Sequence, residues 1–149
     1  MAVAMTLVPF IDVTNVDQSA GAGAGAARIF GPVANCHCSM CRKAQGCAFA
    51  TNASVSTERF RLLQGAEAIT EYESSPGKVR CFCRVCGSPI YSRRLDKPSQ
   101  VRVRFGTLNE DPGVRAELHA CVDSKAPWLE IADGLPQLDS AGRPMATGK

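Results

Sequence analysis

Cysteine thiols carry the clearest chemical signal in the sequence. Seven of the eight cysteines fall into two short segments, residues 36–47 and 81–87, and each segment contains a C-x-C-x2-C pattern. Residues two apart in an extended segment point to the same face, and a tight turn brings a third sulfur round to them. The pattern therefore predicts two groups of converging thiolates, one formed by Cys36, Cys38 and Cys41 and the other by Cys81, Cys83 and Cys86.

The first of these triads predicts a zinc site of one of two kinds. Structural zinc is usually closed by four protein ligands, whereas catalytic zinc keeps one position for water or substrate. A remote cysteine could supply the fourth ligand, and spacing alone does not decide between the two kinds. His37 lies between two ligands, so its ring projects away from the sulfurs if the segment is extended. It is therefore a poor fourth ligand but a candidate base or outer-shell donor.

Other reactive or charged residues near the triads have weaker signals. Arg42 and Lys43 directly follow the third ligand and could lower thiolate pKa values or hold a substrate carboxylate. A solvated helical turn explains these two residues equally well. Cys47 and Cys121 lie outside the tight spacing, so a packing role is favoured for both.

Composition narrows the class of protein. A hydrophobic fraction of 45% and a charged fraction of 21% are typical of a soluble globular protein. The net charge of +3 is far from the concentrated basic surface of nucleic-acid-binding proteins. No apolar run approaches the roughly 18 residues that cross a bilayer, and the opening residues lack the basic flank of a secretory signal. We therefore expect a cytoplasmic protein with reduced cysteines and no membrane or nucleic-acid partner.

The chain is predicted to hold one domain with irregular ends. Residues 1–30 decay into a Gly/Ala stretch typical of a flexible linker. Residues 31–139 form the expected domain, and residues 140–149 are predicted to be a disordered tail because they offer no core face. The oligomeric state stays open, and a homodimer is one alternative.

Short apolar segments between turn residues predict mainly β structure of short antiparallel strands. Residues 101–105 alternate valine and phenylalanine with arginine, which predicts a half-buried strand whose arginines face solvent. Weaker strand candidates are residues 60–63, 69–72, 89–91 and 118–122. Ser39 is a candidate cap for a helical turn over residues 41–45, and residues 56–59 predict another short turn.

Two motifs and several shorter matches give the sequence a family resemblance. With CHCSMCRK at residues 36–43 and CRVCGSP at residues 83–89, it resembles the glutathione-dependent formaldehyde-activating enzyme family, which includes centromere protein V. The match continues through FGTL at 105–108, His119, SKAPW at 124–128 and LPQ at 135–137.

The resemblance implies a zinc-binding, Mss4-like fold with two layers of short strands and two metal sites. In family members the segment matched by Cys36, Cys38 and Cys41 holds the zinc linked to activity. The pair matched by Cys83 and Cys86 joins an earlier C-x-C to close a structural zinc.

The amino terminus departs from this pattern, because no cysteine precedes Cys36. Cys81 could replace one missing ligand, and Asp17, Cys121 or a partner chain could supply another. A displaced amino terminus explains the departure equally well. We therefore expect one occupied zinc site, at the first triad, and leave the second in doubt.

The resemblance implies a carbon–sulfur lyase of the S-(hydroxymethyl)glutathione synthase type, acting on glutathione or another thiol and an aldehyde. The zinc ligands and His37 would form the catalytic group. Arg42, Lys43 and Lys125 are candidates for binding the carboxylates of glutathione. Trp128 could wall the pocket, although a core anchor is favoured for a single large aromatic residue.

Two other classes of function stay open. A zinc-organised binding module for a protein or chromatin surface would be favoured by a fourth protein ligand. A redox protein would need oxidised cysteines and no metal, and C-x-C-x2-C is a poor fit to C-x-x-C redox motifs.

Overall fold

The computed structural model describes residues 30–62, 65–108 and 111–146. The predicted linker over residues 1–30 lies outside the described residues except for Phe30, so that prediction stays untested. Within the described residues, no helix is long and apolar enough to cross a bilayer.

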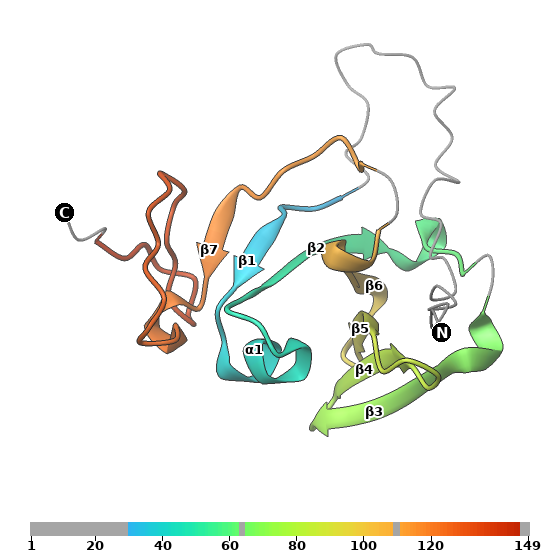
Figure 1. The fold of residues 1–149 in the computed structure, drawn as a ribbon. Helices are drawn as coiled ribbons and strands as arrows, with labels where there is room; N and C mark the ends of the chain where they lie inside the picture. Colours follow the sequence, from blue (N-terminus) through green and yellow to red (C-terminus); the bar gives the residue numbers. More distant parts are fainter. Residues whose placement is uncertain (1–29, 63–64, 109–110, 147–149) are drawn as a thin grey trace, which may run out of the picture.

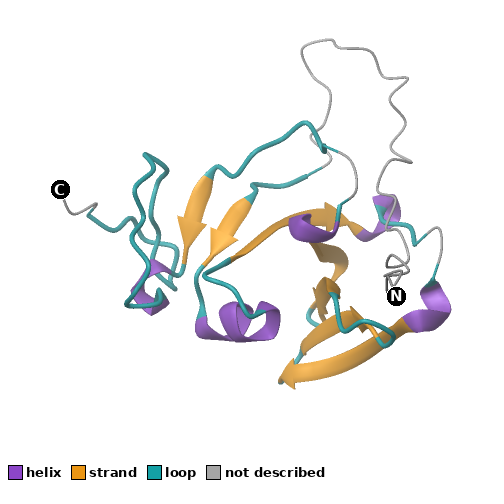
Figure 2. Ribbon diagram, in the orientation of Figure 1, coloured by secondary structure: helices purple, strands orange, loops and turns teal. Residues whose placement is uncertain are grey.

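One sheet dominates the described chain. It has seven strands in the order β3-β4-β5-β6-β2-β1-β7, and α1 lies at the end of β1 (Figures 1 and 2). The strands are β1 (Ala34–Cys36), β2 (Ala50–Ser56), β3 (Ile69–Ser75), β4 (Lys78–Cys83), β5 (Pro89–Arg94), β6 (Lys97–Arg104) and β7 (Leu118–Ala120). The helices are α1 (Ser39–Gln45) and the 3-10 turns η1 (Thr57–Arg59), η2 (Ala66–Ala68), η3 (Phe105–Thr107) and η4 (Val122–Ser124).

The mainly β prediction is confirmed, and this arrangement is consistent with a small Mss4-like fold. Two details differ from the expectation. The described strands form a single continuous sheet in place of two separate layers, and β1 pairs with β7 in parallel while the other neighbours are antiparallel.

The predicted strands match the structure where valine, isoleucine or tyrosine marks them. Residues 69–72 and 89–91 lie within β3 and β5, whereas residues 101–105 and 118–122 overlap β6 and β7. Residues 60–62 are not a strand, since Phe60 and Leu62 pack against the core from a loop. β1, β2 and β4 were not predicted. In β2 the reason is its composition, because it is built largely from alanine, serine, threonine and asparagine.

The two faces of the sheet carry different side chains. Val101, Val103, Ala53 and Val55 pack with Phe30 and Val33 in the main core cluster. Residues directly opposite each other on neighbouring strands share a face. On the other face, Arg80 of β4 lies opposite Ser92 of β5, which lies opposite Arg102 of β6.

The prediction that the arginines of β6 face solvent is only half correct. Arg102 is exposed, but Arg104 is only 2% exposed. Arg104 pairs with Asn52 of β2, and β2 is the neighbour of β1. Arg104 therefore lies in the part of the sheet that adjoins the cysteine segment, where its side chain is buried.

Residues 140–146, which belong to the predicted disordered tail, have defined local contacts. Asp139 accepts hydrogen bonds from the backbone N–H groups of Ala141 and Arg143 and forms an ion pair with the Arg143 guanidinium. The Met145 N–H donates to the carbonyl of Gln137, so the segment folds back on itself. Hydrogen bonds of the turn hold this segment, although it buries no apolar face in the core.

Candidate metal centre

Three cysteine sulfurs meet where β1 turns into α1. Cys36 is the last residue of β1, Cys38 precedes the helix and Cys41 lies in its first turn. Their sulfur atoms all lie within 4.8 Å of one another, as predicted for the first triad. The cap of α1 is Cys38, not Ser39 as predicted, because the Cys38 sulfur accepts a hydrogen bond of 3.3 Å from the Cys41 N–H.

Hydrogen bonds to neighbouring segments fix this turn. The His37 N–H donates to the carbonyl of Ala120 at 2.8 Å, and Ser39 N–H donates to the Ser124 hydroxyl. Arg42 donates to the carbonyls of His37 and Ser124 at 3.2 and 3.3 Å. The backbone between the sulfurs is therefore held from both sides, by β7 with η4 and by the helix itself.

The three sulfurs share negative charge unequally. Hydrogen bonds from the thiols of Cys36 and Cys38, followed by the nearby charges of Arg104 and Arg80, lower the pKa of Cys41. Hydrogen bonding to Cys38 and Cys41, together with burial, raises the pKa of Cys36. The hydrogen bonds and the two arginines therefore favour the thiolate form of Cys41.

This donor set fits a zinc ion. Zinc–sulfur bonds of about 2.3 Å in a tetrahedron place sulfurs roughly 3.8 Å apart, and the three sulfurs lie within 4.8 Å of one another. All eight cysteines lie in the described residues, yet none besides Cys36, Cys38 and Cys41 joins the group, and neither does a described histidine, aspartate or glutamate. The described chain therefore supplies three soft ligands for such an ion.

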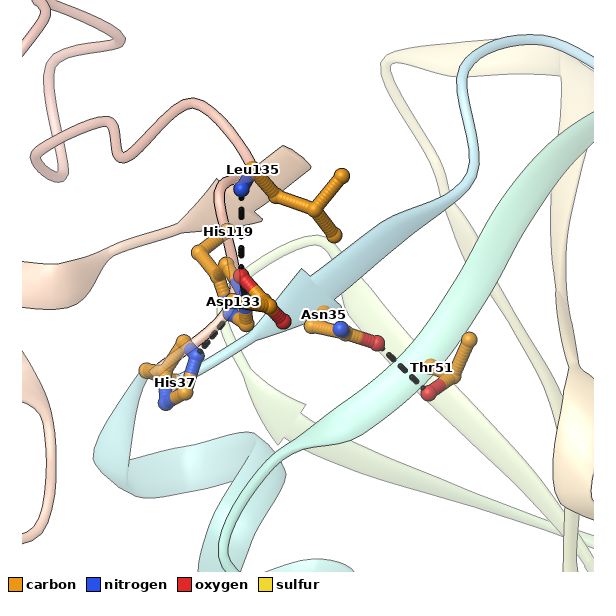
Figure 3. Close-up of polar contacts among 6 residues, drawn as sticks. All are labelled: Asn35, His37, Thr51, His119, Asp133 and Leu135. Carbon is orange, nitrogen blue, oxygen red and sulfur yellow. Dashed lines mark hydrogen bonds and ion pairs between the residues drawn. The ribbon is translucent and has the colours of Figure 1, made fainter. Parts of the chain in front are cut away.

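A buried chain of polar side chains adjoins the metal turn. His37 Nε2 lies 2.7 Å from His119 Nδ1, and His119 Nε2 lies 3.0 Å from both carboxylate oxygens of Asp133 (Figure 3). Both rings are buried, whereas the Asp133 side chain is 51% exposed. The chain runs from the loop between two ligands to the surface.

The Asp133 carboxylate orients the His119 ring. An ionised carboxylate only accepts hydrogen bonds, so His119 Nε2 carries the proton toward Asp133; when His119 is neutral, its Nδ1 accepts from His37 Nε2–H. His37 Nδ1 is then an unprotonated acceptor, and it is buried without a partner among the described residues. Burial lowers the pKa of His37 to about 4, so its ring is neutral near pH 7.

A groove lies beside the sulfur cluster. It has a volume of about 340 Å³ and lies between α1 and strands β3, β4, β5 and β6. Its lining includes Arg80 and Arg104, the aromatic rings of Tyr72, Phe82 and Tyr91, and Met40 of α1. The spacing of the cysteines gave no signal for this groove, because its arginines come from β4 and β6.

The four predicted substrate-binding residues do not line this groove, and their predicted role stays untested. Arg42 and Lys125 donate to backbone carbonyls, and Lys43 is exposed on α1. Trp128 is 71% exposed, so the favoured core-anchor role is wrong, and it does not line the groove. Cys47 is also exposed, with its thiol 2.7 Å from the Phe49 carbonyl, and is not the packed residue that was predicted.

The second cysteine triad does not converge like the first. The Cys81 sulfur lies 3.7 Å from Glu71 Oε1, among its cross-strand neighbours, whereas Cys83 packs against Ala68 and Ile90. Cys86 is exposed beside the Ser88 hydroxyl. The thiols of Cys83 and Cys86 interact with each other, but the three sulfurs of this triad do not form a group like that of Cys36, Cys38 and Cys41.

These features define a small, mainly β protein with a three-cysteine centre of the kind that binds zinc. The family model for the glutathione-dependent formaldehyde-activating enzyme matches residues 27–124. A curated protein of Halomonas elongata, provisionally named as such an enzyme, is 31% identical over 108 residues, which is 67% of this chain and 68% of that protein. This chain belongs to the glutathione-dependent formaldehyde-activating enzyme family.

A solved structure of a Rhodobacter sphaeroides protein is also similar. It is 29% identical, with a TM-score of 0.45, over 54% of this chain and 72% of that chain.

Zinc loading tests the assignment of the first triad. We expect the purified, reduced protein to bind one zinc ion per chain. Changing Cys36, Cys38 or Cys41 to serine should weaken zinc binding by more than about 10-fold, since even outer-shell changes cost that much. Metal analysis with a competing chelator measures the affinity. Cys81→Ser is the matched control, and an equal loss there would assign Cys81 to the site and contradict the geometry.

Alkylation across pH tests the separation of Cys81 from Cys86. Burial raises the pKa of Cys81 to about 11, whereas the Ser88 hydroxyl lowers the pKa of the exposed Cys86. Because the thiolate is the nucleophile, iodoacetamide should modify Cys86 first at pH 7–8 and leave Cys81 intact until about pH 10 or unfolding. Peptide mass spectrometry of the metal-free protein reads this order. Early modification of Cys81 would show that its thiol is neither buried nor protonated.

Proposed function

We propose that the chain is a zinc-dependent enzyme of the carbon–sulfur lyase type that forms and cleaves adducts of formaldehyde with glutathione or a related small thiol. The observation that carries the proposal is the convergence of three sulfurs without a fourth described protein ligand. A closed four-ligand site would have favoured a structural zinc and a binding module. Family membership supports the same substrate pair.

The proposed reaction joins two molecules without an oxidant or reductant. The thiol loses its proton, its sulfur forms a bond to the formaldehyde carbon, and the carbonyl oxygen takes up a proton, which gives the hydroxymethyl thioether. The reverse reaction breaks the carbon–sulfur bond and returns both reactants. Zinc held by Cys36, Cys38 and Cys41 would supply Lewis-acid chemistry, either by polarising the aldehyde oxygen or by stabilising the thiolate at neutral pH.

The surrounding residues have separate parts in this proposal. Arg104 and Arg80 keep positive charge next to Cys41, which favours anionic sulfur near the cluster. The chain of His37, His119 and Asp133 holds the turn between Cys36 and Cys38 in place. His37 was also predicted to act as a base, but its complete burial and its bond to His119 favour a positioning role. Water at the open side of the cluster would then accept the thiol proton.

Exchange between formaldehyde and its glutathione adduct tests the proposal. Two-dimensional 13C exchange NMR with labelled formaldehyde measures how fast the adduct forms and breaks down. We expect the zinc-loaded protein to accelerate the exchange, and Cys38→Ser to lose more than about 10-fold of that acceleration, as loss of metal support does in other sites.

Cys47→Ser is the matched control, because Cys47 lies in the same segment but is exposed and outside the sulfur group. It should keep the wild-type rate. Zinc bound at one ion per chain with no acceleration of exchange would contradict the enzyme proposal and favour the zinc-organised binding module.

A further inference from the structure

We propose that the groove lined by Arg80 and Arg104 is the subsite that binds a carboxylate of the thiol substrate, so that the site selects anionic thiols. This inference rests on the proposed function. It assigns carboxylate binding to Arg80 and Arg104 on one face of the sheet. The sequence had suggested Arg42 and Lys43 on α1 and Lys125 after η4 for this role.

Neither guanidinium in the groove has a carboxylate partner among the described residues. Arg80 Nε donates to the Ser74 hydroxyl at 3.1 Å, and no ion pair between described residues involves Arg80 or Arg104. Arg104 is only 2% exposed, and although its guanidinium forms a hydrogen bond with Cys41, its Nε has no hydrogen-bond partner in the described chain. A buried, unpaired donor is costly, which points to an acceptor that binds there.

The charge around the groove is one-sided. Among the described residues, its lining contains two arginines and no aspartate or glutamate. On the same face, Lys78 donates to Ser92 at 3.0 Å, and its pKa falls to about 8 because of burial and the nearby charges of Arg102, Arg104 and Arg80. Several cations crowd one face of the sheet, so an anion entering the groove relieves their repulsion.

The size and walls of the groove suit a small peptide-like thiol. Its volume of about 340 Å³ lies within the range of small-molecule pockets. Tyr72, Phe82 and Met40 supply apolar contact, while the two arginines supply bidentate donors for a carboxylate. Because Arg104 also lies close to Cys41, a carboxylate held there would place the rest of the molecule beside the sulfur cluster.

A thiol-free probe separates this subsite from turnover. S-methylglutathione keeps both carboxylates but cannot form a thiolate, so its affinity for the zinc-loaded protein, measured by calorimetry, does not depend on catalysis. We expect Arg80→Gln to weaken this binding about 10-fold or more, as loss of a charge-assisted bidentate contact does. The diethyl ester of the probe lacks the carboxylate charges, so it should bind the wild-type protein weakly. Its affinities for the wild-type protein and for Arg80→Gln should be similar.

Arg84→Gln is the matched control, because Arg84 is exposed at the end of β4, does not line the groove and donates to the Glu67 carbonyl. It should bind the probe like wild type. Unchanged probe affinity in Arg80→Gln would overturn the proposal, and a fall in zinc affinity alone would show that the guanidinium serves only the thiolates. Probe binding that depends on Arg80 without any formaldehyde exchange would refute the proposed reaction and leave the subsite standing.

Discussion

The convergence of three sulfurs at the end of one strand is the constraint on which the rest of the site depends. β1 is only Ala34–Cys36, yet it lies between β2 and β7, and this pairing fixes the direction in which Cys36 leaves the sheet. The turn that follows is closed by a sulfur cap on α1 and by hydrogen bonds to Ala120 and Ser124. A three-residue strand with these partners can position ligands as firmly as a longer element, because its neighbours hold it on both edges.

The carboxy-terminal part of the described chain holds this turn through hydrogen bonds of the His37 side chain. Figure 3 shows His119 of β7 between His37 and Asp133, with the Asp133 carboxylate also accepting from the Leu135 N–H. The family match ends at residue 124, so Asp133 lies beyond the matched part, although the two histidines lie within it. One hydrogen-bonded chain thus couples the metal turn to a segment that follows the matched region.

Sequence spacing was sufficient for the ligands but not for their surroundings. Cys36, Cys38 and Cys41 are neighbours along the chain, so strand alternation and one turn bring their sulfurs together wherever the domain folds. Arg80 and Arg104 meet the cluster only through the register of β4, β5, β6 and β2, which no local pattern specifies. The same limit applies to the second triad, where local spacing predicts that three sulfurs converge, whereas Cys83 and Cys86 interact with each other and Cys81 lies beside Glu71.

X-ray absorption at the zinc edge of the loaded, reduced protein tests the central claim most directly. Three cysteine ligands and an open fourth position predict about three sulfurs near 2.3 Å and one lighter oxygen or nitrogen scatterer. The same spectrum in the presence of glutathione should show a fourth sulfur if the thiol enters the open position, or an unchanged shell if the aldehyde oxygen does. Four sulfurs in the protein alone would mean a closed structural site and would contradict the three-thiolate account.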